Sequence, residues 1–292
     1  MTTFSPVQAA LEGLRMTRRK PLVVLAWAAC YFAMVTALGM ILAFAFGGTV
    51  RADLAQLPSN LRDWSDVRQW IDIVARRQGT LLPLIALAVA LQSVITVAIM
   101  RSVLHPQEYR LAYMRLGPAE ARQFVVALVD GAVALVVTAL PSAVLVLIGA
   151  GLISLGTVET NRWVEVIGAV AVAALSIWAR VRLWLLSITT FAEGRLDLRR
   201  TWALTDHHFW HLTLMFIVVL LVTLSVWVIQ SIVAGLILGF SGGATNIVML
   251  ALSGLANLLL APFFFTIQMV ILTAAPARAY YDLHESELAP AA

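Results

Sequence analysis

Six long apolar runs constrain the fold of this chain more than any other feature of its sequence. Each contains about 20 or more mainly apolar residues, enough for an α-helix to cross the hydrocarbon core of a bilayer. They cover residues 22–46, 81–100, 124–153, 163–191, 212–240 and 247–275. Because the runs are continuously apolar and do not alternate, they indicate helices and not strands. The sequence therefore predicts an all-α, polytopic membrane bundle of six transmembrane helices, forming a single domain over residues 1–292.

Composition argues against the other classes of protein. Only 12% of the residues are charged and 61% are apolar, with a mean hydropathy of +0.90, whereas soluble domains carry about 25% charged residues. Intrinsic disorder and an ordinary cytosolic enzyme are thus disfavoured. Cys30 is the only cysteine, so neither an intrachain disulfide nor a cysteine metal site is expected. The first run is longer than the core of a signal peptide, and we expect it to be retained as a span.

The distribution of basic residues predicts the orientation. If the N-terminus is inside, fourteen of the twenty Lys and Arg residues fall on the cytoplasmic side. The remaining six fall outside and are Arg51, Arg62, Arg68, Arg76, Arg77 and Arg162. Since basic residues are enriched in cytoplasmic loops, both termini are predicted to be cytoplasmic.

The longest loop, from about residue 47 to 80, is predicted to contain an amphipathic helix on the outer membrane surface. Asn60 could cap this helix, and Gly79 would end it. Its apolar residues recur at spacings of three and four, and Trp64 and Trp70 are expected at the depth of the headgroups.

Two cytoplasmic connectors are also expected to form amphipathic helices, against the inner leaflet. The first runs from Pro106 to Gly117, with Leu111, Tyr113 and Met114 on its apolar side. The second covers residues 193–211, where Thr205 or Asp206 is expected to cap the fifth span.

The residues of these connectors proposed for the cytoplasmic interface are Arg115, Glu193, Trp202, His207 and His211. Arginines beside them would attract anionic lipid, each by about 1 kcal/mol near the surface. The expected partners are therefore anionic inner-leaflet lipids, together with a membrane protein or a second copy of the chain. Nucleic acid is not an expected partner.

Three charged residues interrupt the apolar runs. Asp130 lies in the third run, and Arg180 and Arg182 lie in the fourth. A lone carboxylate inside a bilayer costs about 2.5–3.5 kcal/mol on insertion scales, so Asp130 should be paired, protonated or hydrated. Either arginine could pair with it, and they point about 200° apart on a helix. The favoured role is an ion pair that fixes helix register; a proton or substrate relay and a phosphate-binding arginine are the alternatives.

The sequence contains no motif of a known enzyme class. A P-loop, a G-x-S-x-G segment and an H-E-x-x-H segment are all absent. His207, His208 and His211 cluster at the start of the fifth span, but a metal site needs further ligands and Asp206 is the only adjacent acid. Neither a metal nor a cofactor is predicted.

The two connectors resemble segments of a group of bacterial membrane proteins. The run Arg115-Leu116-Gly117-Pro118-Ala119-Glu120 resembles an "RLG-x-x-E" segment of uncharacterised six-span proteins. Arg182, Glu193-Gly194 and the residues Trp202, Thr205, Phe209 and Trp210 resemble the pattern of a broader group. This group includes the membrane domain fused to some glycerophosphodiester phosphodiesterases. The chain lacks the phosphodiesterase domain, so the resemblance implies a six-helix fold of the bacterial inner membrane, with Arg182 and Glu193 as structural markers, and no enzyme activity. It also favours Arg182 as the arginine that faces the bundle.

The sequence favours a non-enzymatic integral membrane protein that organises or assists a membrane partner or a lipid. Two alternatives stay open. One is a small transporter or lipid permease that uses Asp130 and Arg182, and the other is a lipid-modifying enzyme with polar groups around Glu193 and His207.

Overall fold

The computed structural model describes residues 5–55, 64–108, 110–154, 158–240 and 247–288. Several side chains within these ranges are not described, chiefly those of residues 45–71, 145–162 and 240–251. Every element in the described part of the chain is a helix. The elements are α1 (Pro6–Ala10), α2 (Glu12–Arg19), α3 (Pro21–Ala55), α4 (Trp64–Leu104), η1 (Arg110–Tyr113), α5 (Pro118–Ser154), α6 (Val158–Trp184), α7 (Leu186–Glu193), α8 (Leu198–His207), α9 (Phe209–Phe240) and α10 (Ile247–Leu288).

Among the described residues, five helices are long and apolar enough to cross a membrane. The qualifying segments are Pro21–Ile41, Leu82–Leu104, Val166–Glu193, Phe209–Ile237 and Leu252–Leu283. They overlap five of the six predicted runs. Such runs form helices because a helix satisfies its own backbone hydrogen bonds in a membrane. The remaining run, 124–153, lies on the 37-residue helix α5, where many side chains in the second half are outside the described set.

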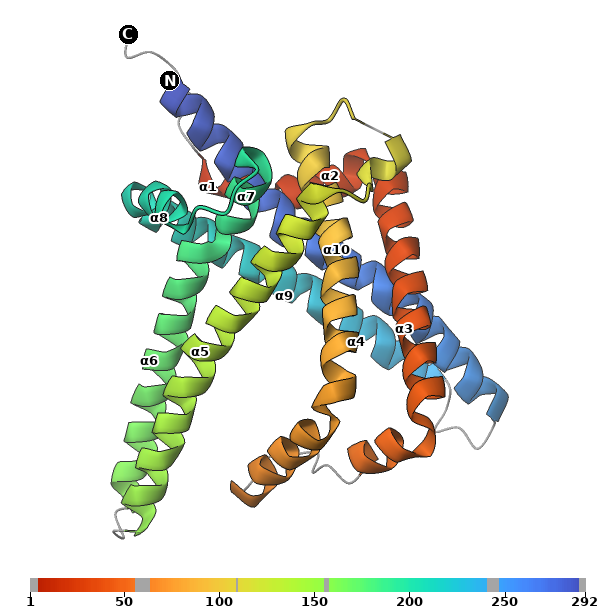
Figure 1. The fold of residues 1–292 in the computed structure, drawn as a ribbon, viewed down its shortest axis with the longest axis vertical. Coiled ribbons are helices and arrows are strands. Elements are labelled where there is room, and N and C mark those ends of the chain that lie inside the picture. Colours follow the sequence, from red (N-terminus) through yellow and green to blue (C-terminus); the bar gives the residue numbers. More distant parts are fainter. Residues whose placement is uncertain (1–4, 56–63, 109, 155–157, 241–246, 289–292) are drawn as a thin grey trace.

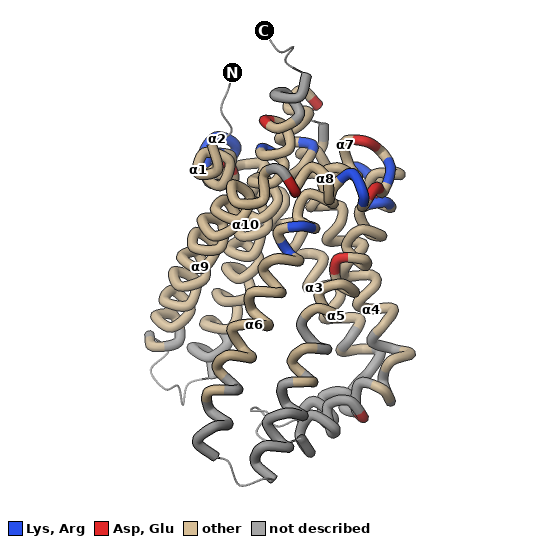
Figure 2. The backbone as a smooth tube through the Cα atoms, turned by 90° about the vertical axis from the view of Figure 1, so that its left-hand side faces the viewer, with Lys and Arg blue, Asp and Glu red and all other residues tan. Residues whose placement is uncertain are grey.

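The short elements gather at one end of the bundle, which we call the charged end. Here α1, α2, η1, α7 and α8 meet the ends of the long helices, and most of the Lys and Arg positions in Figure 2 lie at this end. Away from it, α5 and α6 run side by side as an antiparallel pair and diverge from α9 (Figure 1). The packed core therefore lies at the charged end.

Two apolar clusters make up most of this core. In the first, Ala9 and Ala10 of α1 are buried against Leu212 and Met215 of α9 and against residues of α6 and α10. In the second, Met16 of α2 and Trp27 of α3 pack with residues of α4, η1 and α10. The segment before the first span is thus part of the core, although the sequence indicated only its positive charge.

Local sequence signals explain where the short helices begin and end. Pro6 occupies the first turn of α1, where its missing N–H costs nothing. Asp197 caps α8, because its Oδ1 accepts a hydrogen bond of 3.0 Å from the backbone N–H of Arg200. Gly194 ends α7 in the left-handed conformation, with a φ of 70°, which glycine adopts without steric cost.

One expected helix boundary is wrong. The surface helix predicted to end at Gly79 is instead the beginning of α4, which continues without a break through Gly79 and Pro83 to Leu104. Residues 56–63, including Asn60, lie outside the described residues. Figure 1 shows that α4 changes direction partway along. The fourth predicted run forms one membrane-length segment, in which only Leu185 separates α6, ending at Trp184, from α7, beginning at Leu186.

Gly13 brings α2 into close contact with α10. A Cβ atom at this position would lie 2.5 Å from the Cα of Ile271 and 3.0 Å from the carbonyl oxygen of Val270. These atoms belong to the backbone and cannot rotate away. The absent side chain of Gly13 therefore allows the two helices to touch.

We predict that Gly13→Ala lowers the free energy of unfolding by about 1–3 kcal/mol, because the added methyl overpacks this contact. Gly39→Ala is the matched control, since a Cβ at Gly39 would meet nothing within 4 Å and alanine is the better helix former. Thermal unfolding of the detergent-purified protein measures both. Equal stability of the two variants would contradict the close contact.

Candidate functional site

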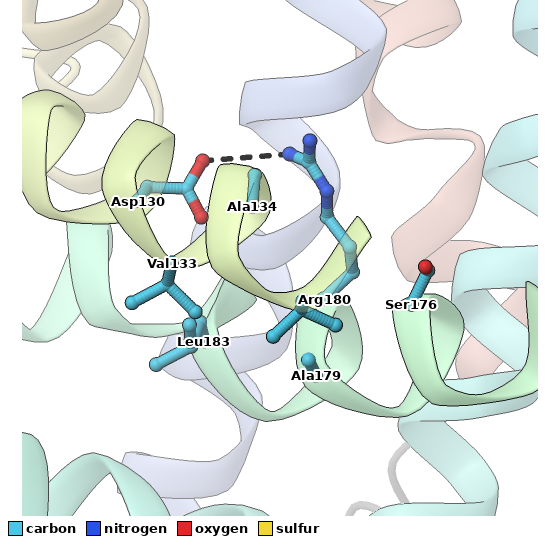
Figure 3. Close-up of a pocket in the computed structure, with 8 residues that line it drawn as sticks. Asp130, Val133, Ala134, Ser176, Ala179, Arg180 and Leu183 are labelled. Atoms are coloured by element: carbon cyan, nitrogen blue, oxygen red, sulfur yellow. Dashed lines mark hydrogen bonds and ion pairs between the residues drawn. The ribbon is translucent and has the colours of Figure 1, made fainter. Parts of the chain in front are cut away.

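Asp130 of α5 and Arg180 of α6 form an ion pair within the predicted membrane region. The Nη1 atom of Arg180 lies 3.4 Å from Oδ2 of Asp130, and both side chains are about half exposed, at 52% and 43%. Figure 3 shows the two groups pointing toward each other from neighbouring helices. A shallow open pocket adjoins the pair and is lined mainly by apolar residues of α5 and α6, with Ser176 as a further polar member. This arrangement presents a carboxylate, a guanidinium and a hydroxyl at one surface.

Arg182 forms a separate cluster with α8 and the start of α9. Its Nη2 donates a hydrogen bond of 2.8 Å to Oδ1 of Asp206, and its Nη1 lies 3.4 Å from Oγ1 of Thr205. The guanidinium carbon is 5.0 Å from the ring centre of Trp202 and 5.1 Å from that of Phe209. Two cation–π contacts and a carboxylate thus hold a side chain that is only 12% exposed.

Arg182 therefore does not face Asp130, and the partner of Asp130 is Arg180. The two arginines are two positions apart on one helix, so when one faces α5 the other faces the opposite side. Arg182 is the more buried of the two, but it faces α8. Asp206, expected as a cap of the fifth span, instead pairs with Arg182, and Thr205 donates to the carbonyl of Trp202 within α8.

A buried ion pair that sequence reasoning missed lies at the centre of the charged end. Arg101 near the end of α4 and Glu120 in the first turn of α5 are joined by Nη2 and Oε1 at 3.0 Å, with side-chain exposures of 9% and 6%. The Nη1 of Arg101 also donates a bond of 2.6 Å to the carbonyl of Tyr113. The Phe191 ring of α7 lies 5.9 Å from the guanidinium. One side chain thus connects four elements.

A left-handed turn in the first connector replaces the amphipathic helix predicted there. Leu111, Ala112 and Tyr113 have φ values of 50°, 52° and 66°, a conformation that costs about 1–2 kcal/mol for each such residue. Contacts with other elements compensate, since Trp27 donates to the carbonyl of Ala112 and Lys20 donates to the Tyr113 hydroxyl. Tyr113 is buried, whereas Leu111 is 81% exposed. The prediction failed because these contacts come from distant parts of the chain.

The structure distributes the interface candidates over two places. Arg115 pairs with Glu108 at 3.1 Å on the exposed side of the first connector. Glu193, at the end of α7, lies 2.9 Å from Nε of Arg200 and 3.8 Å from Nε of Arg195. The remaining three, Trp202, His207 and His211, lie on α8 and α9. Trp202 has one face against Arg182 and is 43% exposed, and the His207 side chain lies outside the described set.

The described residues contain no group of three His, Cys, Asp or Glu side chains placed to hold a metal ion. Cys30 is half-buried in α3. The polar chemistry of the described site consists of arginines, carboxylates and hydroxyls at or near the charged end.

These features define a class of protein. The chain is all-helical, and its apolar helices, with basic residues gathered at one end, are those of a multi-pass membrane protein. No family model, curated protein or solved structure matches the chain.

We predict that Arg101→Met and Glu120→Leu each lower the free energy of unfolding by about 3–5 kcal/mol, because each leaves a buried charge unpaired. The double variant should lose less than the sum of the single variants. Denaturant unfolding of the purified protein measures this coupling.

The exposed pair of Arg115 and Glu108 is the matched control. Its two side chains are 43% and 46% exposed, and solvent screening should limit its coupling to about 0–1 kcal/mol. Similar coupling in the two pairs would show that the Arg101–Glu120 pair is not buried in the folded protein.

Proposed function

We propose that this chain is a six-span protein of the bacterial inner membrane, with both termini in the cytoplasm. Its proposed role is non-enzymatic, and it organises or assists a membrane partner or a lipid. The span proposed in addition to the five described segments is the third run, 124–153, on α5. This helix is long enough to cross a membrane and is paired along its length with α6 (Figure 1). The orientation is supported by the basic residues gathered at the end where α1 and the last turns of α10 lie.

The observation that carries the proposed role is the uneven packing of the bundle. Tight contacts are concentrated at the charged end, while the long helices keep exposed apolar faces beyond it. On α9, Leu220, Leu221, Leu224 and Trp227 are each more than 50% exposed. In a bilayer, such faces contact lipid chains or the helices of another protein. A rigid cytoplasmic end with open apolar faces is suited to holding a partner or lipid.

The resemblance to the six-span group supports this role in a further way. Arg182, Trp202, Thr205 and Phe209, which carry part of the shared pattern, form one cluster that joins α6 to α8 and α9. Their contacts with one another explain the pattern as a structural one. From the other shared segment, Arg115 forms an ion pair within the first connector, and Glu120 forms the buried pair that joins α5 to α4.

A small transporter or lipid permease is the second candidate, and the Asp130–Arg180 pair favours it. The pair is half exposed and adjoins an open pocket between α5 and α6. A permease would use Asp130 with Arg180, and not with Arg182 as the sequence suggested. A substrate with both a basic and an acidic group could then replace the pair's own contact.

One experiment separates the two candidates. In a strain that lacks the native gene and shows a growth or envelope defect, we expect the double variant Asp130→Asn/Arg180→Gln to restore wild-type behaviour. The double variant removes both charges together and so avoids an unpaired charge in the membrane. Either single variant should lower the amount of folded protein, because the remaining charge has no partner.

The control is the double variant Arg115→Gln/Glu108→Gln, which removes an exposed pair outside the apolar runs. The informative outcome is an Asp130/Arg180 double variant that is inserted in normal amounts but does not restore growth, while the control does. In that case the role of organising or assisting a partner or lipid is wrong, and the permease is favoured.

A further inference from the structure

Arg122 is a half-buried arginine for which the structure offers no counter-charge. It lies in the second turn of α5, two residues before the apolar run that begins at 124. Its Nε atom is buried and has no hydrogen-bond partner. Among the described residues, no carboxylate forms an ion pair with it. Because a guanidinium does not lose its proton in a protein, this group stays charged.

The side chain lies flat against the end of α7. A Cβ atom on Gly194 would lie 3.8 Å from both Nη atoms of Arg122 and 3.9 Å from its Cζ. Three nearly equal distances indicate that the face of the guanidinium is turned toward Gly194. Gly194 places no side chain on this face, and its φ of 70° disfavours other residues.

Glu193, the acid next to Gly194, forms ion pairs with other arginines, and Glu120, the nearest acid in the sequence, pairs with Arg101. The Glu193 carboxylate lies 2.9 Å from Arg200 and 3.8 Å from Arg195, and neither oxygen is within ion-pair distance of Arg122. Glu193 therefore forms its ion pairs with the arginines that follow it in the chain and none with Arg122, and its Oε1 atom is buried without a hydrogen-bond partner.

Two other buried arginines of this fold each have a carboxylate partner, which Arg122 lacks among the described residues. Arg101 is neutralised by Glu120, and Arg182 is neutralised by Asp206. The Nε of Arg182 is also buried without a partner, but its Nη atoms bind a carboxylate. Since an unpaired charge that is partly removed from water is costly, an anion from outside the chain would stabilise Arg122.

The position of Arg122 identifies the chemistry of this anion. The residue lies at the charged end just before an apolar run, which is the depth of lipid phosphates if the orientation proposed above is correct. A planar guanidinium binds phosphate oxygens through two parallel hydrogen bonds.

We propose that Arg122 binds the phosphate of an anionic membrane lipid, at the place where α5 meets the Gly194 end of α7. This inference deepens the proposed function, on which it rests for the orientation of the charged end.

Native mass spectrometry of the full chain in detergent, titrated with phosphatidylglycerol, tests the proposal. We expect Arg122→Gln to bind phosphatidylglycerol about tenfold more weakly, because a charge-assisted contact to phosphate is lost. Arg199→Gln is the matched control, since it removes one exposed charge from the same region. In a neutral micelle its effect should be less than about twofold, as screening weakens a distant charge. Equal losses in the two variants, or no loss in Arg122→Gln, would overturn the site.

Two measurements on the wild-type protein do not depend on the folding of a variant. Phosphatidylglycerol should raise the melting temperature more than phosphatidylcholine does, and equal shifts would overturn the proposal. Inorganic phosphate should neither reproduce the shift nor displace the lipid; if it does both, the site binds a free anion and the assignment to lipid is wrong. Lipid binding by purified protein does not depend on the cellular defect, so either proposal can fail without the other.

Discussion

The buried guanidinium of Arg101 holds the charged end of the bundle together. It bonds to Glu120 at the start of α5 and to the carbonyl of Tyr113, and it lies beside Phe191 of α7. If this side chain were removed, Glu120 would be left buried and unpaired, and the left-handed turn would lose one of its supports. Four elements, α4, η1, α5 and α7, thus depend on one charge.

The location of the packed core follows from what surrounds each part of the bundle, water in one part and lipid in the other. Near water, burial of apolar side chains stabilises tight packing, so α1 and α2 are held against α9 and α10. Within lipid this force is absent, because lipid chains are as apolar as leucine, and helices associate through close contacts and polar groups. The divergence of the α5–α6 pair from α9 (Figure 1) is consistent with this difference. The ion pair of Asp130 and Arg180 is a polar contact that links helices α5 and α6.

Much of the helical architecture could be predicted, since a run of apolar residues specifies a helix by local rules. The partner of Asp130 could not be chosen, because Arg180 and Arg182 differ only in helical phase and the phase depends on where α8 packs. The Arg101–Glu120 pair was missed for a similar reason. Glu120 is the last residue of the Arg115–Glu120 segment, yet no local signal in the sequence connected it to Arg101 at the end of another span. The turn at residues 111–113 contradicts local helix preference, and only contacts from Lys20, Trp27 and Arg101 explain it.

Hydrogen exchange of the full chain in lipid nanodiscs tests the central claim, that the packed core of this protein is at its charged end. Segments 9–19 and 110–123 lie outside or at the edge of the apolar runs, where amides without tertiary contacts exchange fast. The structure predicts slow exchange in both segments, and faster exchange in them after Arg101→Met. Fast exchange of these segments in the wild-type protein would contradict the account.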